Sequence, residues 1–499
     1  MMMALQSQNA EVVVVGAGSA GLYAALTTAR EGARTVLVSQ AALATTASYW
    51  AQGGIAAALG PDDSPELHAQ DTIDAGRQLG RESAVRVLVD DSPAAVQDLL
   101  ALGVDFDRDG DGALALGLEG GHSRRRVVHA GGSATGRRVT RQLSARVAEH
   151  PSITVVEHAS AKSLIVEDGR CVGVEVAIGD QPLTIPARAV VLATGGSAAL
   201  WARSTNPPAA IGSGLTMAHH AGAQLADLEF LQFHPTALLS PSRNQGFLIT
   251  EAIRGEGAKL LDRSGERFID ELAPRDEVAA AVERRITGDD GSPPSPVFLD
   301  MRKIDPLLFP NVYTKIEEAG LNPRTEPIPV APAAHYSMGG IVTDLEARTN
   351  VPGLLAVGEC ACTGLHGANR LASNSLAECA VFGRRAALAA LTEPALSDPL
   401  RTQILGGDAQ VVEHIEDPDP AATRRLLWEC AGIERSAEKL GQLAGSANPL
   451  VRLIGAASLV REETRGAHHR SDFPAKDDKL DFRHFVFGPD DSPNAERWD

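Results

Sequence analysis

The chain has 499 residues, of which 44 % are hydrophobic and 22 % charged, and 48 are glycine. This composition excludes a disordered, collagen-like or coiled-coil chain, and at roughly 150 residues per domain the length predicts about three domains. The 64 acidic residues against 46 Lys and Arg give a net charge of −18, which repels phosphate backbones and anionic lipid, so we expect neither nucleic acid nor a membrane as a partner.

Cysteine usage and hydropathy point to the cytoplasm. The five cysteines include no CxxC pair, which favours neither a disulfide framework nor a zinc site. No apolar run reaches the ~18 residues of a membrane helix, and residues 1–10 lack the cationic and apolar regions of a secretory leader. We therefore expect a cytoplasmic protein without a metal site.

A dinucleotide-binding pattern opens the chain. Residues 12–15 predict a buried strand, GAGSAG at 16–21 a glycine turn, residues 22–30 a helix and residues 35–38 a second strand. Gly16 permits the tight turn, Gly18 lets the backbone approach a pyrophosphate, and Gly21 lets helix and strand pack, with the helix N-terminus facing the phosphates. The pattern serves NAD or FAD, and Ser39-Gln40, where an acidic ribose ligand is usual, does not decide between them.

Further segments suit a large cofactor. Residues 47–56 form an apolar, glycine-containing loop that could lie against a flat ring. Residues 190–196 and 353–359 each read as a buried strand that ends in a glycine turn. Because these pieces lie on both sides of residues 233–329, the sequence predicts a discontinuous FAD-binding domain at 1–232 and 330–390 around a capping domain at 233–329. Leu/Ala-rich patterns predict a C-terminal helical domain at 395–499, with a polar tail from residue 488.

Longer motifs carry a specific resemblance. The chain resembles the succinate dehydrogenase/fumarate reductase flavoprotein superfamily from about residue 10 to about 475, in QFHPT (232–236), TE (250–251), RGEG (254–257), APRD (273–276) and HYSMGG (335–340). EGGHSRRR (119–126) and GLHGANRLASNSL (364–376) resemble its L-aspartate oxidase branch. The resemblance implies an α/β fold: a Rossmann-like FAD-binding domain with an inserted α+β capping domain and a C-terminal helical domain.

The same resemblance implies noncovalent FAD. Ala47 stands where succinate dehydrogenases and fumarate reductases usually carry the histidine that bonds to the flavin, and residues 45–50 contain no histidine. Gln40 and Ser213 depart from the Lys and Asp that the branch usually has there. The implied FAD contacts are Gly16, Ala17, Gly18, Ser19, Ala20, Gly21, Ser39, Gln40, Ala47, Ser48, Tyr49, Trp50, Ala51, Gln52, Gly53, Gly54, Ala161, Thr194, Gly195, Ser213, Glu359, Ser375 and Leu376.

Four cationic or imidazole side chains suggest the substrate class. Arg275, Arg370, His234 and His335 occur in turn-like or Gly/Pro-flanked segments, where functional side chains are often presented. The arginine fork fits a carboxylate edge, so the set suits a small dicarboxylate.

The resemblance assigns roles to these catalytic candidates and their neighbours. It implies His234, Thr250 and Glu251 around the distal carboxylate, and His335 and Arg370 on the carboxylate beside the reacting carbon. Arg275 is implied as proton donor or acceptor. Glu119 is implied as the counter-charge for an α-ammonium, which needs one when it leaves water.

The implied reaction is oxidation of L-aspartate to iminoaspartate, with FAD accepting a hydride and oxygen or fumarate reoxidising it, oxygen giving hydrogen peroxide. In the branch that the chain resembles, quinolinate synthase consumes the product on the way to NAD. One alternative is the flavoprotein subunit of a succinate dehydrogenase/fumarate reductase complex with an iron–sulfur partner, which Glu119 and the missing flavin-linking histidine disfavour. Another is an FAD-binding protein without turnover, which the filled acid, base and clamp positions disfavour.

Overall fold

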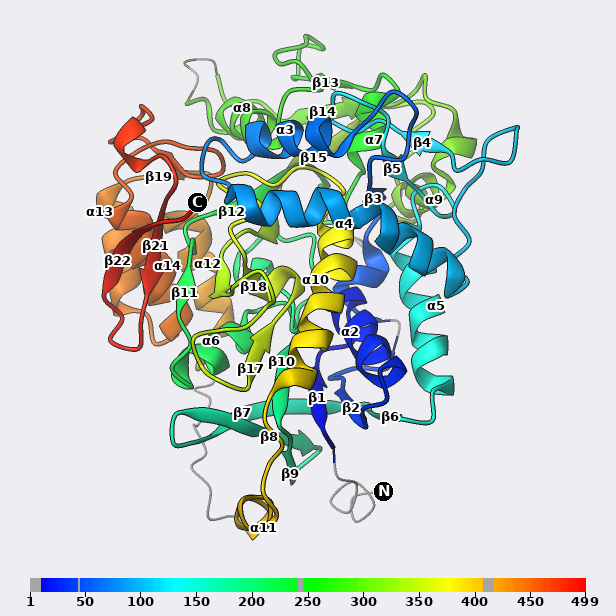
Figure 1. Cartoon of the computed structure of the whole chain (residues 1–499). Coiled ribbons are helices and arrows are strands. Elements are labelled where there is room, and N and C mark those ends of the chain that lie inside the picture. Colours follow the sequence, from blue (N-terminus) through cyan, green and yellow to red (C-terminus); the bar gives the residue numbers. More distant parts are fainter. Residues whose placement is uncertain (1–9, 44, 241–245, 290, 292, 407–416) are drawn as a thin grey trace.

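The computed structural model describes residues 10–43, 45–240, 246–289, 291, 293–406 and 417–499. The expected domains also include residues 1–9, 44, 241–245, 290, 292 and 407–416, which lie outside the described residues. Figure 1 shows a central sheet with helices, a second group of strands and helices above it in the view, and the C-terminal elements at one side.

The central sheet has five parallel strands in the order β17-β10-β1-β2-β6. They are β1 (Val12–Val15), β2 (Thr35–Val38), β6 (Ile153–Val156), β10 (Ala189–Leu192) and β17 (Leu354–Ala356). The valine run buries β1 completely, as a strand covered on both faces of a parallel sheet requires. The connection order reverses between β1 and β10, and such switch points are where α/β sheets bind ligands. The predicted Rossmann-like α/β fold is confirmed.

Helices pack tightly against one another around this sheet. α2 (Ser19–Arg30) lies beside α10 (Asn374–Thr392) and α5 (Thr135–Glu149), while α3 (Pro65–Ala75) and α4 (Glu82–Ala101) pack together nearby (Figure 1). A Cβ at Gly383 of α10 would lie 3.2 Å from the backbone oxygen of Ala20, so glycine permits the close contact with α2. In the part of the chain that the structure describes, no helix is both long and apolar enough to cross a membrane.

Two small antiparallel sheets join this unit. One has the order β3-β5-β4 and the other β7-β8-β9. Their strands are β3 (Ile55–Ala56), β4 (Leu116–Gly117), β5 (Val127–Val128), β7 (Ala159–Glu167), β8 (Arg170–Ile178) and β9 (Gln181–Pro186). Short 3-10 turns are η1 (Ala47–Trp50), η2 (Ala198–Leu200), η3 (Pro306–Leu308), η4 (Gly358–Cys360), η5 (Gln442–Gly445) and η6 (Asp478–Leu480).

The segment at 231–337 contains an antiparallel sheet with its own core. Its strands, in the order β12-β15-β14-β13, are β12 (Leu231–Leu238), β13 (Lys259–Leu261), β14 (Val297–Asp300) and β15 (Ile328–Ser337). Its helices are α7 (Glu251–Gly255), α8 (Arg275–Thr287) and α9 (Pro310–Glu318). The pairing of β12 with β15 slips between Gln232 and Phe233 and again between His234 and Ala237. Bulges of this kind re-aim side chains, here beside the candidate catalytic histidine His234.

The C-terminal part is helical at first but ends in strands. Its helices are α11 (Asp398–Gly406), α12 (Pro420–Cys430), α13 (Ala437–Gly441) and α14 (Pro449–Val460), and β19 (Glu434–Arg435) pairs with β20 (His469–Arg470). A further sheet has the order β18-β16-β11-β21-β22 and consists of β11 (Leu225–Ala226), β16 (Gly340–Val342), β18 (Ala361–Cys362), β21 (Arg483–Phe487) and β22 (Pro493–Arg497). α6 (Ser213–His220) precedes β11.

The polar tail expected from residue 488 contains a strand that the sequence did not predict. Residues 493–497 form the edge strand β22, whose backbone pairs with β21 from Arg483 to Phe487. Most β22 side chains are exposed, and backbone hydrogen bonds to β21 hold the strand. Its polar sequence therefore lacks the hydrophobic alternation by which strands are usually predicted. The chain then ends at Asp499, which accepts a hydrogen bond of 2.8 Å from Arg81 Nε.

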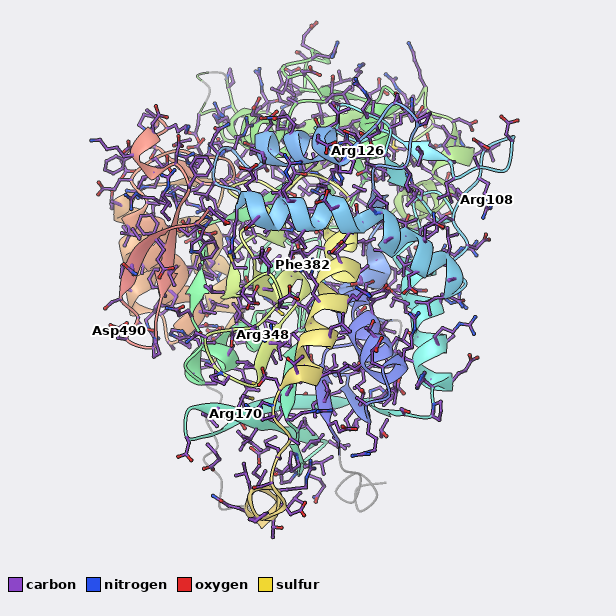
Figure 2. The ribbon with its side chains drawn as sticks, in the orientation of Figure 1. Arg108, Arg126, Arg170, Arg348, Phe382 and Asp490 are labelled. Atoms are coloured by element: carbon purple, nitrogen blue, oxygen red, sulfur yellow. The ribbon has the colours of Figure 1, made fainter. Side chains whose placement is uncertain are left out.

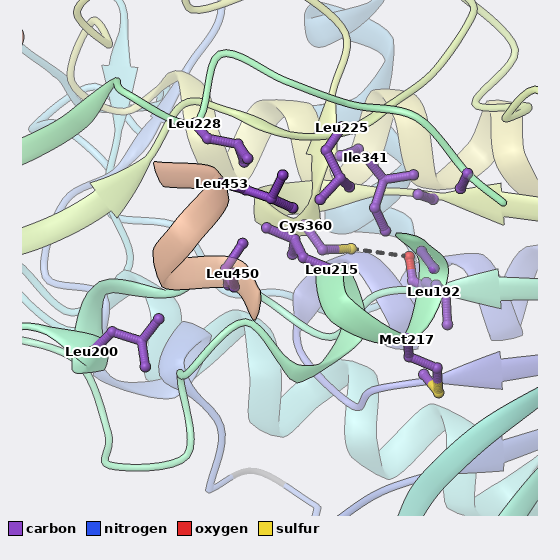
Figure 3. Close-up of a cluster of buried hydrophobic side chains, with 14 of the residues drawn as sticks. Leu192, Leu200, Leu215, Met217, Leu225, Leu228, Ile341, Cys360, Leu450 and Leu453 are labelled. Atoms are coloured by element: carbon purple, nitrogen blue, oxygen red, sulfur yellow. Dashed lines mark hydrogen bonds between the residues drawn. The ribbon is translucent and has the colours of Figure 1, made fainter. Parts of the chain in front are cut away.

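The C-terminal helices share a core with the central unit. Figure 3 shows Leu450 and Leu453 of α14 packed near Leu215 of α6 and Leu225 of β11, in one buried cluster with Leu192 of β10. The dashed line in that view is the contact of Cys360 Sγ with the Leu192 carbonyl, at 3.3 Å. This shared core attaches the C-terminal part to the unit that carries the glycine turn.

Candidate active site

The glycine turn fits tightly against the end of β10. Gly16 has a φ of 112°, and a Cβ there would lie 2.2 Å from the backbone oxygen of Ala193. A Cβ at Gly21 would lie 1.9 Å from the oxygen of Gly16. Only glycine fits both positions, so the turn after β1 meets the turn after β10 at the switch point of the sheet.

The loop at 47–50 lies beside the start of α2. The Ser19 backbone N–H donates to Ser48 Oγ at 3.1 Å, and a Cβ at Gly18 would lie 3.2 Å from the same hydroxyl. The loop is not uniformly buried, however: Trp50 is 57 % exposed, and its ring meets that of Tyr49 edge to face, at 5.1 Å between centroids. The contact of this loop with a flat ring stays a prediction, for Trp50 as for the other loop residues.

Unpartnered polar atoms test whether this region fits FAD. Ser19 Oγ, Thr46 Oγ1, Gln52 Oε1 and Thr194 Oγ1 are buried and find no hydrogen-bond partner among the described residues. They belong to the first turn of α2, the 46–52 loop and the turn after β10. Buried polar groups are normally paired, so a cluster of unpaired ones indicates a polar ligand, and the phosphates and hydroxyls of FAD fit it.

The other expected cofactor contacts lie around the same turn. Ala17, Ala20 and Ser39 are buried while Gln40 is exposed, and the Ala159 N–H of β7, two residues before Ala161, bonds to the Ser39 oxygen at 2.9 Å. Ser375 and Leu376 lie in the first turn of α10, Ser213 begins α6, and Gly195 has a φ of 77°. Glu359 accepts from the Ser337 N–H at 3.0 Å, and burial raises the pKa of Glu359 to about 7.

A cavity of about 230 Å³ lies among the end of α3, the loop at 120–121, the starts of α7 and α8, and the loop before α10. It is lined by Asp71, Asp74, Ala75, Arg77, Gly120, Gly121, Glu251, Pro274, Arg275, Asn369, Arg370, Leu371 and Ala372. Of the predicted substrate residues, Glu251, Arg275 and Arg370 line the cavity. The other four do not line it: Thr250 and Glu119 are next in the chain to the lining residues Glu251 and Gly120, His335 contacts Arg370, and His234 contacts His335.

A single glutamine connects the two predicted arginines. Gln232 Oε1 accepts from Arg275 Nη1 at 3.1 Å and from Arg370 Nε at 3.3 Å, and Gln232 Nε2 donates to the Arg370 carbonyl at 2.8 Å. Arg275 Nε also donates to Glu251 Oε2 at 2.6 Å. Burial, with the Arg275 charge nearby, lowers the pKa of Arg370 to about 10. Gln232 opens the QFHPT motif, but sequence reasoning gave it no role.

The two histidines lie on adjacent strands rather than in turns. His234 of β12 and His335 of β15 are 5.3 Å apart between ring centroids. His234 Nδ1 accepts from the Thr236 N–H at 3.3 Å, which places its proton on Nε2, an atom with no partner in the described part of the chain. His335 Nε2 lies 3.4 Å from Arg370 Nη2. Burial and the neighbouring arginines hold the pKa of both rings well below 6.5, so both are neutral.

Glu119 is a buried carboxylate with two donors. Ser373 Oγ donates to Glu119 Oε2 at 2.7 Å, and His129 Nε2 lies 3.3 Å from Oε1. Burial alone would raise the pKa of Glu119, but the His129 and Ser373 hydrogen bonds and the Arg275 charge lower it to about 2. Ser373 has a φ of 63°, a strained conformation for a residue other than glycine and one that occurs most at functional sites. Sequence reasoning missed Ser373 and His129, although both stand in or beside quoted motifs.

Close packing at Gly120 and polar contacts of Arg126 and His122 hold the loop after Glu119 in place. A Cβ at Gly120 would lie 1.9 Å from Glu251 Oε1, so only glycine fits against that carboxylate. Arg126, which Figure 2 labels near α3, pairs with Asp63 at 2.8 Å and also with Asp71 of α3, and His122 Nε2 lies 2.9 Å from the Ala372 carbonyl. The basic half of EGGHSRRR therefore anchors the loop.

Glu251 forms ion pairs with Arg275 and Arg254. Thr250 precedes α7 and is buried, as is Glu251, the first residue of that helix. Burial would raise the pKa of Glu251, but the charges of Arg275 and Arg254 lower it, so the carboxylate is ionised. Arg254 Nη2 lies 3.7 Å from Glu251 Oε2. No cluster suited to a metal ion occurs among the residues that the structure describes.

Comparisons with known proteins show what the chain is similar to. A family model described as FAD binding domain matches residues 11–376, and one described as fumarate reductase flavoprotein C-term matches residues 449–496. The L-aspartate oxidase of Mesorhizobium japonicum is 44 % identical over 488 residues, with 93 % of this chain and 92 % of that protein covered. The L-aspartate oxidase of Streptomyces coelicolor is 42 % identical, with 96 % and 91 % covered. The structure of an E. coli quinol fumarate reductase has a TM-score of 0.85 at 29 % identity, with 98 % and 96 % covered.

Proposed function

The chain belongs to the L-aspartate oxidase family, within the succinate dehydrogenase/fumarate reductase flavoproteins, and we propose that it oxidises L-aspartate to iminoaspartate with FAD, the first step of NAD biosynthesis through quinolinate. The observation that carries the substrate class is a pair of arginines beside one cavity, the partly buried Arg275 and the buried Arg370, with the carboxylate of Glu119 nearby. Two cations suit two carboxylates, and one anion suits an ammonium.

Noncovalent attachment of FAD is part of this proposal. The unpartnered polar atoms Ser19 Oγ, Gln52 Oε1 and Thr194 Oγ1 would bind it together with the backbone of the glycine turn, and the methyl group of Ala47 offers no nucleophile. When bound, FAD supplies the two-electron acceptor for the oxidation. The N-terminal ends of α2 and α10 would favour phosphate and other electron-rich groups, because backbone N–H groups point outward there.

The two carboxylates of the substrate receive different partners. Arg370 and the neighbouring His335 would hold the α-carboxylate, since the guanidinium is buried and its partners there are otherwise neutral. His234 would donate its free Nε2 proton to the distal carboxylate, near Thr250 and Glu251. Because both imidazoles are neutral, each serves as a hydrogen-bond donor or acceptor without adding a charge.

Arg275 and Glu119 handle charge at the reacting end. Arg275 would be the proton donor or acceptor of the reaction, and Glu251 Oε2, which accepts from Arg275 Nε at 2.6 Å, stabilises its cation. Glu119 would pair with the α-ammonium of aspartate, which succinate lacks. This pairing distinguishes the proposed activity from that of a succinate dehydrogenase/fumarate reductase subunit with an iron–sulfur partner.

The cavity also supports a division of the chain into three domains. We assign residues 233–329 to a cap over an FAD-binding domain at 1–232 and 330–390, because Glu251 and Arg275 of the cap meet Arg370 of the other domain around one cavity. The remaining residues, 395–499, form the C-terminal domain. Oxygen and fumarate are the proposed final acceptors, and quinolinate synthase is the proposed consumer of iminoaspartate.

An anaerobic mixing experiment tests the activity. The purified protein, reconstituted with FAD, is mixed without oxygen with L-aspartate, D-aspartate or succinate, and the absorbance of oxidised flavin is followed. We expect L-aspartate to bleach the flavin and the enantiomer to leave it oxidised. Bleaching by succinate alone would contradict the proposal and support the alternative subunit.

A further inference from the structure

A turn outside the known motifs joins the two substrate-handling arginines. Arg77 lies just after α3, and its guanidinium contacts both Asp276 oxygens, at 2.9 Å for the shortest contact, and Glu277 at 2.6 Å. Asp276 is the residue next to Arg275 in the first turn of α8. Arg77 also lines the cavity. One end of this contact therefore adjoins Arg275.

The other end leads to Arg370. The Ala368 N–H donates to the Gly76 carbonyl at 3.0 Å, and the Arg81 N–H donates to the Gly364 carbonyl at 2.9 Å, so the turn at 76–81 is paired with the loop that carries Arg370. A Cβ at Gly367 would lie 2.5 Å from the Gly76 oxygen. The two loops thus approach as closely as backbones can.

The turn is held in an unfavourable conformation. Arg77 and Gln78 are consecutive residues with a φ of 57°, a region that residues other than glycine rarely occupy. The Arg77 carbonyl accepts from Arg465 Nη1 at 2.7 Å, and the Gln78 carbonyl accepts from the Phe482 N–H at 3.1 Å. Such strain persists where surrounding contacts enforce it, and it concentrates at functional sites.

We propose that Arg77 is a positioning residue for the reaction: it bridges the loop of Arg370 to the first turn of the helix of Arg275, and so sets the spacing of the two arginines around the substrate. The inference rests on the proposed function. Burial raises the pKa of Asp276 even beside Arg77, so removal of the Arg77 cation leaves a buried acid without its partner at the start of α8. Arg275 then loses its fixed place relative to Arg370.

The test compares variants of the bridge with a matched arginine elsewhere. Arg77→Asn removes the cation while tolerating the left-handed backbone, Arg77→Lys keeps the charge without the fork, and Asp276→Asn changes the other partner. Arg385→Ala is the control, because Arg385 is also partly exposed and pairs with Asp91 and Glu346 away from the cavity. Each holoenzyme is mixed anaerobically with aspartate, succinate binding is measured by calorimetry, and Tm is recorded.

We expect Arg77→Asn to lower the limiting rate of flavin reduction by about 10- to 100-fold, as misplacement of a reacting group does, with Arg77→Lys between it and the wild type. Asp276→Asn should match Arg77→Asn, and the double variant should be no slower than either, because the two residues act as one bridge. Succinate binding should weaken in the bridge variants and not in Arg385→Ala.

The proposal is overturned if Arg77→Asn and Arg385→Ala lower Tm equally and leave flavin reduction and succinate binding unchanged. It is also overturned if the losses in the rate of flavin reduction caused by Arg77→Asn and Asp276→Asn multiply in the double variant. If Arg77→Asn does not fold, Asp276→Asn alone decides by the same two readouts. If the wild type is not reduced by aspartate, the proposed function fails, and the calorimetry still tests the spacing.

Discussion

Arg275 and Arg370 donate hydrogen bonds to the same atom, the side-chain oxygen of Gln232. A neutral amide thus separates a buried cation, Arg370, from a partly buried one, Arg275, and the two come from different segments of the chain. Coulomb repulsion between such cations favours an anion in the adjacent cavity, so the pair is prepared for a carboxylate ligand. This relationship links the fold to the proposed substrate.

Replacement of Gln232 tests that link. Gln232→Leu removes the shared acceptor, and we expect KM for aspartate to rise by about tenfold, since each arginine loses one hydrogen bond of about 1–2 kcal/mol. Gln232→Glu places a permanent carboxylate between the cations and should raise KM further by competing with substrate. Steady-state oxygen consumption measures both. Equal activity of Gln232→Glu and the wild type would contradict the account.

Replacement of Arg370 and replacement of Arg275 should affect different kinetic constants. Arg370→Leu removes the partner of the α-carboxylate and should weaken substrate binding by about 2–5 kcal/mol. Arg275→Leu acts on the reaction and should lower kcat more than it raises KM. Anaerobic flavin reduction over a range of aspartate concentrations separates the two effects. A raised KM alone in both variants would show that the division of roles is wrong.

FAD should leave the protein completely on denaturation. Acid precipitation of the holoenzyme should release all yellow colour into the supernatant, because Ala47 has no group that can bond to the flavin. Absorbance spectra of the supernatant and the redissolved pellet make the measurement. Flavin that remains in the pellet would indicate a covalent link elsewhere.

Stability should fall in mild acid through His68. His68 of α3 lies 2.8 Å from Asn374 at the start of α10, and burial lowers the pKa of His68 to about 4. The folded state keeps the ring neutral while the unfolded chain protonates it below about pH 6.5. Its contribution to the free energy of unfolding is therefore present above that pH and lost as the pH falls towards about 4. Tm measured at several pH values should show a shallower acid slope for His68→Gln than for the wild type; parallel slopes would exclude His68 as a cause.

Local features of the site could be predicted from the sequence, and distant contacts could not. Gly16 and Gly21 must be glycine because nearby backbone atoms leave no room for a Cβ. The spacing of glycines in the motif therefore indicates this turn from the sequence alone. Gln232 and Ser373 act through residues 138 and 254 positions away, and no local pattern indicates such pairs. The strand β22 was missed because main-chain pairing holds it, and pairing leaves no mark on an exposed, polar edge strand.

Glu119 carries the claim that the site selects aspartate over dicarboxylates without nitrogen. The most direct measurement is kcat/KM for aspartate oxidation and for fumarate reduction on Glu119→Gln, which removes the charge and keeps much of the shape. The account predicts that aspartate oxidation falls, by up to about 3 kcal/mol as an ammonium loses its counter-charge, while fumarate reduction is unchanged or improved. A parallel loss on both substrates would show that Glu119 only maintains the structure, and would contradict the account.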